Sequence, residues 1–215
     1  MYKHFLKRVF DIILGLLGFP FFLIAFLVFG PIIKLTDKGP VFYNAERIGK
    51  DGKLFKMYKF RSMYVNAPDI RNADGSTYNG ADDPRVTKVG KVMRATSIDE
   101  LPQVINILNG TMSLIGPRPD PPDDMLIYTE KQKEKLKVRP GLTGYNQAYF
   151  RNSVEQNEKF ENDLFYAKHV SLWFDIKIFF KTIVTVLSHK SVYNDASVPN
   201  SAELEKIGKN HAEKK

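Results

Sequence analysis

The hydrophobic pattern of this chain is dominated by one uninterrupted apolar run near its N-terminus. Residues 12–33 carry no charged side chain, and at about 1.5 Å per residue the run is long enough for a helix to cross the hydrocarbon core of a bilayer. Pro20 lies inside the run, where it removes a helix hydrogen bond that lipid cannot replace. The pattern therefore predicts a membrane-embedded helix that is broken at Pro20.

The charges that flank the run bear on whether its two ends lie on the same side of the membrane. Lys3, Lys7 and Arg8 precede it, and Lys34 and Lys38 follow it. Because basic residues favour the cytoplasmic side, this arrangement favours a re-entrant helix with both ends in the cytoplasm. An ordinary kinked transmembrane helix is the alternative that the charges leave open. A cleaved signal peptide fits poorly, because the run is longer than a usual signal-peptide core.

Beyond the apolar run, short strand patterns are followed by helical ones, which predicts a mostly helical α+β fold. Residues 41–60 alternate around a turn at 50–53, as in a β-hairpin. Residues 66–85 are rich in Asn, Asp, Gly and Pro and predict a loop, either passive or able to close over a site. Helices are expected at about 86–95, 99–109, 121–137, 154–169 and 172–187. We expect a membrane-anchoring segment at 1–36, a globular domain at 37–190 and a polar tail at 191–215.

The last expected helix mixes aromatic and basic residues. Trp173, Phe174 and Phe180 are interspersed with Lys177 and Lys181, which lie four residues apart and share a helix face. This pattern predicts an amphipathic helix that lies along the membrane interface. A core helix with two exposed lysines is the alternative.

Composition narrows the possible chemistry. The chain has 215 residues, of which 43% are hydrophobic and 26% charged, as in a globular protein. It contains no cysteine and four scattered histidines, so oxygen ligands and a hard cation such as Mg²⁺ are the expected metal chemistry. The net charge of +8 predicts an anionic partner: nucleic acid, a phosphorylated molecule or an acidic membrane. No P-loop, dinucleotide or serine-hydrolase motif is present.

Two adjacent carboxylates, Asp99 and Glu100, lie at the expected start of a helix. A helix N-terminus keeps a carboxylate ionised and can hold a phosphate beside it, and an ionised Asp can act as a nucleophile or a metal ligand. The structural alternative is a capping box formed by Ser97 with Glu100. With Asp99 as the cap instead, Pro102 would fall in the permissive first turn. The pattern leaves these alternatives open.

Basic residues recur in stiff or patterned segments between the hairpin and the last helices. They are Lys59, Arg61, Arg94, Arg118 and Arg139. A proline on each side of Arg118 fixes the local backbone, which suits bidentate recognition of a diphosphate. For a single arginine, a solvated ion pair is the commoner role. The prediction of an anion-binding site therefore rests on these five basic residues taken together.

Five ordered motifs give the chain a family resemblance. They are Lys59–Met63 (KFRSM), Arg94, Asp99–Gln103 (DELPQ), Gly116–Pro119 (GPRP) and Arg139–Gly144 (RPGLTG). In order and spacing the chain resembles the bacterial monotopic phosphoglycosyl transferases, also called bacterial sugar transferases. The resemblance extends from Lys7 to about Leu187 and is closest to the minimal catalytic form, without the extra transmembrane helices of larger relatives.

The resemblance implies an enzyme that starts glycan assembly. It would transfer a sugar 1-phosphate from a UDP-sugar to undecaprenyl (polyprenyl) phosphate with release of UMP, at the cytoplasmic face of the bacterial inner membrane. It also implies that Asp99 is the nucleophile, that Mg²⁺ bridges Asp99 and the diphosphate, and that Glu100 acts on the acceptor phosphate or the metal. Candidate substrate-binding residues are Lys59, Arg61, Arg94, Pro117, Arg118, Arg139 and Gln147. The identity of the sugar and a possible homo-oligomer are left open.

The chain departs from the family pattern at two places. Phe19 precedes Pro20 where many relatives have serine, so a hydroxyl that could satisfy a freed carbonyl is missing. Tyr145 follows the RPGLTG motif where tryptophan is frequent, which bears on sugar preference. The alternative function is a non-catalytic, membrane-tethered basic module that binds anionic lipids or partner proteins. A non-catalytic module of this kind does not explain two adjacent acids beside rigid arginine-containing loops. Nucleic-acid binding would explain the positive charge but not the apolar run.

Overall fold

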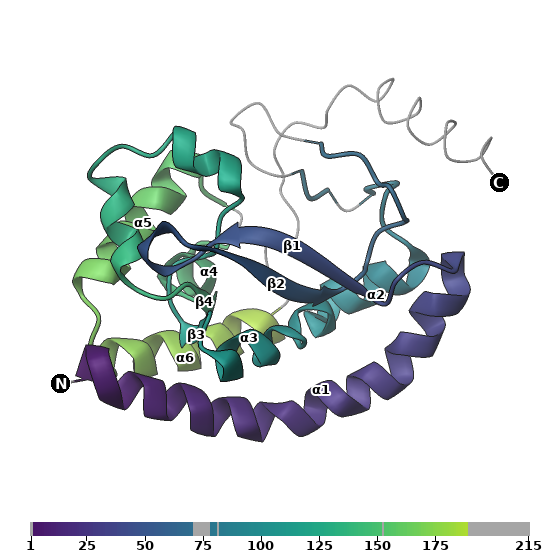
Figure 1. Ribbon diagram of the computed structural model, residues 1–215, viewed down its shortest axis with the longest axis horizontal. Helices are drawn as coiled ribbons and strands as arrows, with labels where there is room; N and C mark the ends of the chain where they lie inside the picture. The colour runs from purple at the N-terminus through teal and green to yellow at the C-terminus, as the bar shows by residue number, and fades with distance from the viewer. Residues whose placement is uncertain (1, 71–77, 81, 152, 189–215) are drawn as a thin grey trace.

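The computed structural model describes residues 2–70, 78–80, 82–151 and 153–188, and it has the mostly helical α+β architecture that the sequence predicts. A π-helical turn at Tyr2–Leu6 leads into the long helix α1. Figure 1 shows α1 curving along one side of the molecule, with the other elements on its concave side. The elements are α1 (Lys7–Asp37), β1 (Phe42–Ile48), β2 (Leu54–Phe60), α2 (Lys88–Thr96), α3 (Gln103–Asn109), β3 (Ser113–Ile115), β4 (Gly141–Thr143), α4 (Tyr145–Tyr149), α5 (Gln156–Lys168) and α6 (Leu172–Leu187).

Helix α1 is not interrupted at Pro20. It remains helical through both Pro20 and Pro31 and bends smoothly in Figure 1, in place of the break that the sequence predicts. Residues on both sides of Pro20 are packed against the rest of the fold, since Gly15 lies against Ile107 and Leu108 of α3 and Phe22 stacks on Phe60 of β2. Such packing supports the backbone where the proline removes one hydrogen bond. Re-entrant insertion into a membrane stays a prediction.

The two faces of α1 differ sharply. Its buried residues recur at helical spacing and include Asp11, Gly15, Phe22, Ala25 and Ile33, which form the seam with the globular part. Its opposite face is apolar and exposed, and Leu27, for example, is 72% exposed. By length and composition alone, α1 is the single helix in the described ranges that could cross a membrane. A large exposed apolar face of this kind marks a surface that contacts lipid or another protein.

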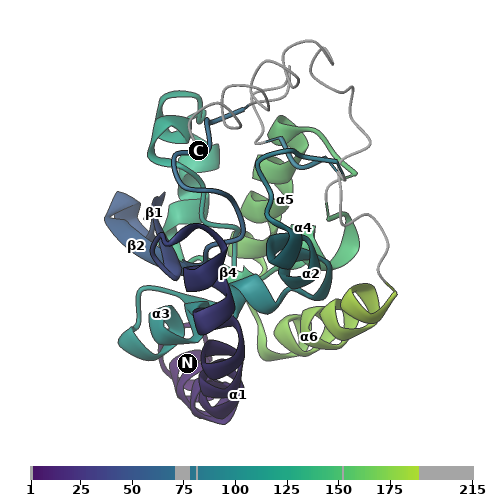
Figure 2. The ribbon, with the colours of Figure 1, turned by 90° about the vertical axis from the view of Figure 1, so that its right-hand side faces the viewer.

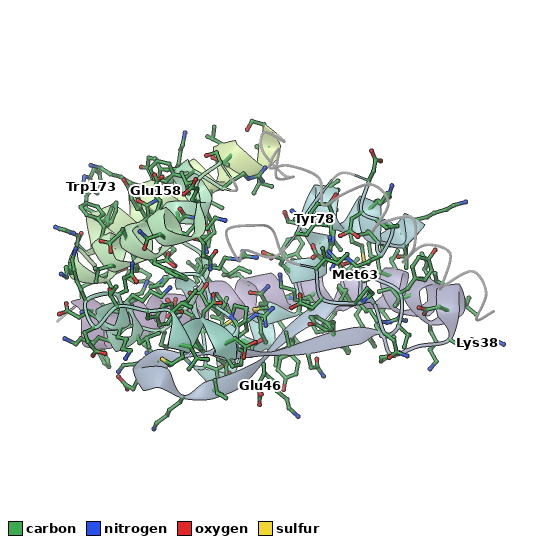
Figure 3. The ribbon with its side chains drawn as sticks, turned by 90° about the horizontal axis from the view of Figure 1, so that it is seen from above. Lys38, Glu46, Met63, Tyr78, Glu158 and Trp173 are labelled. Atoms are coloured by element: carbon green, nitrogen blue, oxygen red, sulfur yellow. The ribbon has the colours of Figure 1, made fainter. Side chains whose placement is uncertain are left out.

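Helix α6 exposes apolar residues on the same side of the molecule as α1. Trp173 is 66% exposed, and Phe180, Val184 and Leu187 are exposed as well. Figures 1 and 2 both place α1 and α6 along the lower side. In Figure 3, Lys38, just after α1, and Trp173, in α6, lie at opposite ends of the molecule. Both helices thus carry exposed apolar residues, and the interfacial position of α6 stays a prediction.

Polar contacts fasten both ends of α1 to the same globular part. Near its start, Arg8 donates from Nη1 to the Ile107 carbonyl (2.6 Å) and from Nη2 to the Leu108 carbonyl (2.9 Å). At its end, Asp37 forms a two-pronged ion pair with Arg61, with N–O distances of 2.5 and 2.6 Å. Both ends of α1 are thus attached to the same globular part of the protein.

The predicted hairpin is confirmed, and a second small sheet joins distant segments. Strands β1 and β2 pair antiparallel, with Phe42 opposite Phe60 and Ile48 opposite Leu54. Strands β3 and β4 pair in parallel. Because the carboxyl ends of parallel strands meet at one edge, the segments that follow β3 and β4 lie next to each other.

The helix predictions that follow the hairpin have different outcomes. The helices expected near 86–95, 154–169 and 172–187 are confirmed as α2, α5 and α6. The helix expected at 121–137 is wrong: two short 3₁₀ helices occur at Pro122–Leu126 and Gln132–Lys137. Adjacent prolines at its start lack N–H groups, and the later segment turns Lys135 into the interior. The tail at 191–215 and part of the 66–85 loop lie outside the described residues.

Candidate active site

Asp99 and Glu100 lie in one 3₁₀ turn between α2 and α3. Ser97, just before this turn, has a left-handed backbone (φ 59°) and ends α2. Its side chain makes no capping hydrogen bond, and the N-cap position of α3 is occupied by Pro102, so α3 begins later than predicted. The helix-capping interpretation of both acids is therefore wrong. Their carboxylates are not used to start the helix.

Glu100 forms an ion pair with Lys59 from the hairpin. The Lys59 ammonium donates to Glu100 Oε1 at 2.6 Å, and the two side chains are 16% and 27% exposed. Burial acts to raise the pKa of Glu100, but the positive charges of Lys59 and Arg118 lower it below its ordinary value. Glu100 is consequently held ionised, with cations from two separate segments around it.

Asp99 is more deeply buried than Glu100 and has a different electrostatic environment. Its residue is 9% exposed. Burial raises the pKa of Asp99 to about 6, although Lys59 and Arg94 act in the opposite direction; the charge of Glu100 raises it further. Such a carboxylate is ionised at neutral pH but more basic than a solvated aspartate. Paired acids with divergent environments are a hallmark of catalytic sites.

Arg94 joins the acidic pair to the segment expected to form a loop. It projects from the last turn of α2, where its Nε donates to Ser62 Oγ (3.0 Å) and its Nη1 donates to Asn79 Oδ1 (3.2 Å). Its positive charge lowers the pKa of Asp99. Asn79, in the 66–85 loop, therefore contacts a residue of the site. Such a contact is required if the loop closes over the site, and is not expected of a passive surface loop. Closure of the loop stays a prediction.

The Arg118 loop approaches the acids from the edge of the small parallel sheet. Pro117 is buried, and its carbonyl accepts a hydrogen bond from the Gly141 N–H (2.8 Å). Arg118 itself is exposed, and its charge lowers the pKa of Glu100. The backbone around Arg118 is therefore held rigid by hydrogen bonds to β4 as well as by the flanking prolines, as the sequence predicts. Its planar fork suits a phosphate or diphosphate.

Two arginines predicted to bind substrate serve structural contacts. Arg61 is 7% exposed; besides its ion pair with Asp37, its Nε donates to the Pro40 carbonyl at 2.5 Å. Arg139 donates from Nε to the carbonyl of Gly110 (2.8 Å), which ends α3 at the terminus opposite the acids. Arg61 thus attaches the end of α1, and the Nε of Arg139 binds at the C-terminus of α3; substrate binding by either arginine stays a prediction.

Gln147 and Arg151 lie in and just after α4, beside the Arg118 loop. Gln147 Oε1 and the Gly116 carbonyl both lie against Gly144. Within the described residues, both amide atoms of Gln147 are buried without a hydrogen-bond partner, which is costly unless a ligand satisfies them. Arg151, whose φ is 51°, also lowers the pKa of Glu100. The sequence interpretation missed Arg151; its place soon after the RPGLTG motif was the available signal.

The oxygen ligands at the site suit a metal that is bound jointly with substrate. In the part of the chain that the structure describes, no three or more His, Asp or Glu side chains converge on a metal position. Asp99 and Glu100 supply two adjacent carboxylates. Mg²⁺ is commonly held by one or two carboxylates together with substrate phosphates. These residues therefore fit Mg²⁺ better than a metal that needs a complete protein cage.

Asp99 is a buried carboxylate with a raised pKa and with Lys59 and Arg94 nearby, and the same molecule has a long exposed apolar face on α1. This combination is typical of a membrane-associated protein that acts on a phosphorylated substrate. The chain matches the family described as bacterial sugar transferase over residues 2–189 and belongs to that family. The family resemblance of the five motifs is thereby confirmed.

Relatives with more specific names share most of this chain. It is 37% identical over 208 residues to an undecaprenyl-phosphate galactose phosphotransferase of Salmonella typhimurium, covering 89% of this chain and 42% of that protein. It is 39% identical over 194 residues to a UDP-N-acetylgalactosamine-undecaprenyl-phosphate N-acetylgalactosaminephosphotransferase of Aeromonas hydrophila, covering 86% and 44%. The chain therefore spans less than half of these relatives. It is also 38% identical to the uncharacterized sugar transferase EpsL of Bacillus subtilis, covering 87% and 90%.

Proposed function

We propose that this chain transfers a sugar 1-phosphate from a UDP-sugar to undecaprenyl (polyprenyl) phosphate and releases UMP. The proposal is carried by one observation: buried Asp99 lies beside an ionised Glu100 within a ring of cations. The names of the Salmonella and Aeromonas relatives supply the class of donor and acceptor. The transfer would begin the assembly of a capsule, an exopolysaccharide or a protein-linked glycan.

The first step is a displacement at phosphorus. A carboxylate oxygen of Asp99 attacks the phosphorus that bears the sugar, and a phosphosugar-aspartyl bond forms. The phosphoanhydride bond to the other phosphorus breaks, and UMP leaves with its electron pair. A carboxylate can approach a dianionic diphosphate only where positive charge offsets the repulsion. Arg94 and Arg118 supply that charge from opposite segments of the site.

The second step transfers the same phosphorus to the lipid. A phosphate oxygen of the polyprenyl phosphate attacks the intermediate, the bond to Asp99 breaks, and a polyprenyl diphosphate sugar is released with a free carboxylate. Glu100 holds the Lys59 ammonium beside the site, where the incoming phosphate needs a cation. Because Glu100 is held ionised by its cationic neighbours, the acceptor phosphate enters as the dianion and no proton needs to be removed from it in this step.

Asp99, together with the donor diphosphate, would hold Mg²⁺, with Glu100 adjacent to it. When bound, the ion neutralises charge that builds up on the phosphate oxygens during the displacement. Within the protein, this leaves Arg94 and Arg118 to orient the diphosphate by hydrogen bonds.

The attachment of α1 supports a monotopic placement on the cytoplasmic face of the bacterial inner membrane. Arg8 at one end and Asp37 at the other both bind the same globular part, which supports a placement with both ends on one side of a bilayer. A spanning helix would carry its ends to opposite sides. Basic residues at both ends of the helix favour the cytoplasmic side.

Cysteine labelling tests this placement directly, because the chain has no native cysteine. In intact cells, a membrane-impermeant maleimide is expected to label neither His4→Cys nor the matched variant Glu46→Cys, which lies on the exposed face of β1. Permeabilised cells should label both. Labelling of position 4 alone in intact cells would show that α1 spans the membrane.

The proposed activity is tested by UMP release from the purified full chain, supplied with Mg²⁺, undecaprenyl phosphate and single UDP-sugars in turn. We expect repeated release with at least one donor, dependent on the lipid beyond the first turnover and abolished by EDTA. The productive donor would identify the sugar. A folded protein that releases no UMP across hexose, N-acetylated and amino-sugar donors, yet binds anionic vesicles, would support the non-catalytic module instead.

A further inference from the structure

Lys135 is a buried cation that the proposed chemistry does not use. It lies in the 3₁₀ helix Gln132–Lys137 and is 1% exposed. Its ammonium forms a short hydrogen bond with the Asp120 carboxylate and lies 3.5 Å from Asp163 Oδ2. It also lies over the rings of Tyr128 and Phe160, at 4.6 and 4.4 Å from their centroids. A fully buried ammonium is unfavourable unless its partners hold it closely.

Both carboxylates that hold Lys135 are connected to the Arg118 loop. Asp120 lies two residues after Arg118, and its carboxylate also accepts a hydrogen bond from Tyr128 Oη (2.6 Å). The Asp120 carbonyl accepts from the Ile48 N–H at 2.9 Å. Asp163 lies near the Arg118 backbone, whose N–H lowers the pKa of Asp163 against the larger effect of its burial, while Asp163 Oδ1 is buried without a hydrogen-bond partner among the described residues. Lys135 thus links Asp120, which belongs to the loop itself, to Asp163 on α5.

The other end of the loop is fixed by strand β4. The Gly116 N–H donates to the Thr143 carbonyl at 2.9 Å, and the Pro117 carbonyl accepts from Gly141. A Cβ atom at Gly116 would lie 2.4 Å from the Arg139 carbonyl, so a larger residue would push the loop away. Of residues 116–120, Arg118 is the exposed one. The loop is held on both sides, and the arginine projects from its middle.

We propose that Lys135 is a positioning residue for Arg118. By holding Asp120 and Asp163, it fixes the backbone from which the guanidinium reaches the donor diphosphate. The inference rests on the proposed function, since it assigns Lys135 a role in that same transfer. A displacement of about 1 Å in a positioning group can lower a rate about a hundredfold, so a distant buried ion pair can control turnover.

A double-mutant cycle separates positioning from a general structural role. The four proteins are the full-length wild type, Lys135→Met, Arg118→Ala and the double variant, compared by kcat and KM for UMP release. We expect Lys135→Met to lower kcat/KM about ten- to a hundredfold, but less than about twofold when Arg118 is already alanine. Equal losses in both backgrounds would overturn the inference. Lys133→Met, in the same 3₁₀ helix but partly exposed, is the matched control and should retain full activity.

Removing a buried cation can prevent folding, so milder variants complete the test. Tyr128→Phe deletes one hydrogen bond to Asp120 while keeping the ring, and Lys135→Arg retains the charge. We expect Tyr128→Phe to lower kcat/KM several-fold only when Arg118 is present, and Lys135→Arg to recover most of the activity that Lys135→Met loses. Additive losses for Tyr128→Phe would contradict positioning. An inactive wild type would refute the proposed function, whereas an active wild type with additive losses would refute this inference alone.

Discussion

Replacing Asp99 with asparagine is expected to slow UMP release at least about a thousandfold, as the loss of a covalent nucleophile does in other enzymes. The amide has nearly the same shape, and the Asp99 side chain does not cap a helix. Because burial raises the pKa of Asp99 to about 6, Asp99 is ionised at neutral pH, and its charge there destabilises the folded protein relative to the unfolded chain. The neutral amide should therefore leave the thermal midpoint unchanged or raise it.

The measurement is single-turnover UMP release together with trapping of labelled phosphosugar on the protein. Wild-type protein incubated with donor alone should carry the label, and Asp99→Asn should not. Asp123→Asn, an exposed acid in the 3₁₀ helix Pro122–Leu126, is the matched control and should behave like the wild type. If Asp99→Asn kept more than about a tenth of the wild-type rate, covalent catalysis by Asp99 would be ruled out.

Much of the fold follows from local patterns. The alternation of Leu54–Phe60 and the turn before it specify the hairpin, and helical spacing specifies α5 and α6. Local patterns fail where a tertiary partner decides the backbone. The 121–137 segment has helix-forming residues, yet Lys135 must turn inward to reach Asp120, and two short 3₁₀ helices allow this. Likewise, Pro20 predicts a break, but packing against α3 keeps the helix continuous.

The candidate site was found from the sequence where residues close in the chain act together. The adjacent acids are such a case, and so is the proline-flanked Arg118. Arg61 and Arg139 show the limit of this reasoning, because a motif gives the residue type but not its partner: Asp37 pairs with Arg61, and the Gly110 carbonyl accepts from the Nε of Arg139. Lys135, which lies behind the Arg118 loop, has no local signal that distinguishes it from a surface cation, and Arg151 has only its place soon after the RPGLTG motif.

Replacing Arg118 with lysine is expected to lower kcat/KM for the UDP-sugar about a hundredfold, even though the charge is kept. Arginine presents a planar fork that can donate two parallel hydrogen bonds to a diphosphate, whereas lysine is a point charge on a flexible stem. Arg118 is exposed and stands on a loop that is fixed at both ends, so the substitution should not alter stability. Steady-state kinetics with the productive donor and a thermal melt measure the two effects.

Arg47→Lys on the hairpin is the control for arginine loss in general, since Arg47 donates to the carbonyl of neighbouring Glu46 (2.8 Å) and should tolerate lysine. The division of the Arg118 effect between kcat and KM tells where the fork acts. A fall in kcat would mean that the guanidinium binds the phosphate more tightly as UMP leaves, while a rise in KM alone would mean that it binds the donor equally before and during displacement. Unchanged kinetics would remove Arg118 from the site and, with it, the reason for Lys135 to be buried behind its loop.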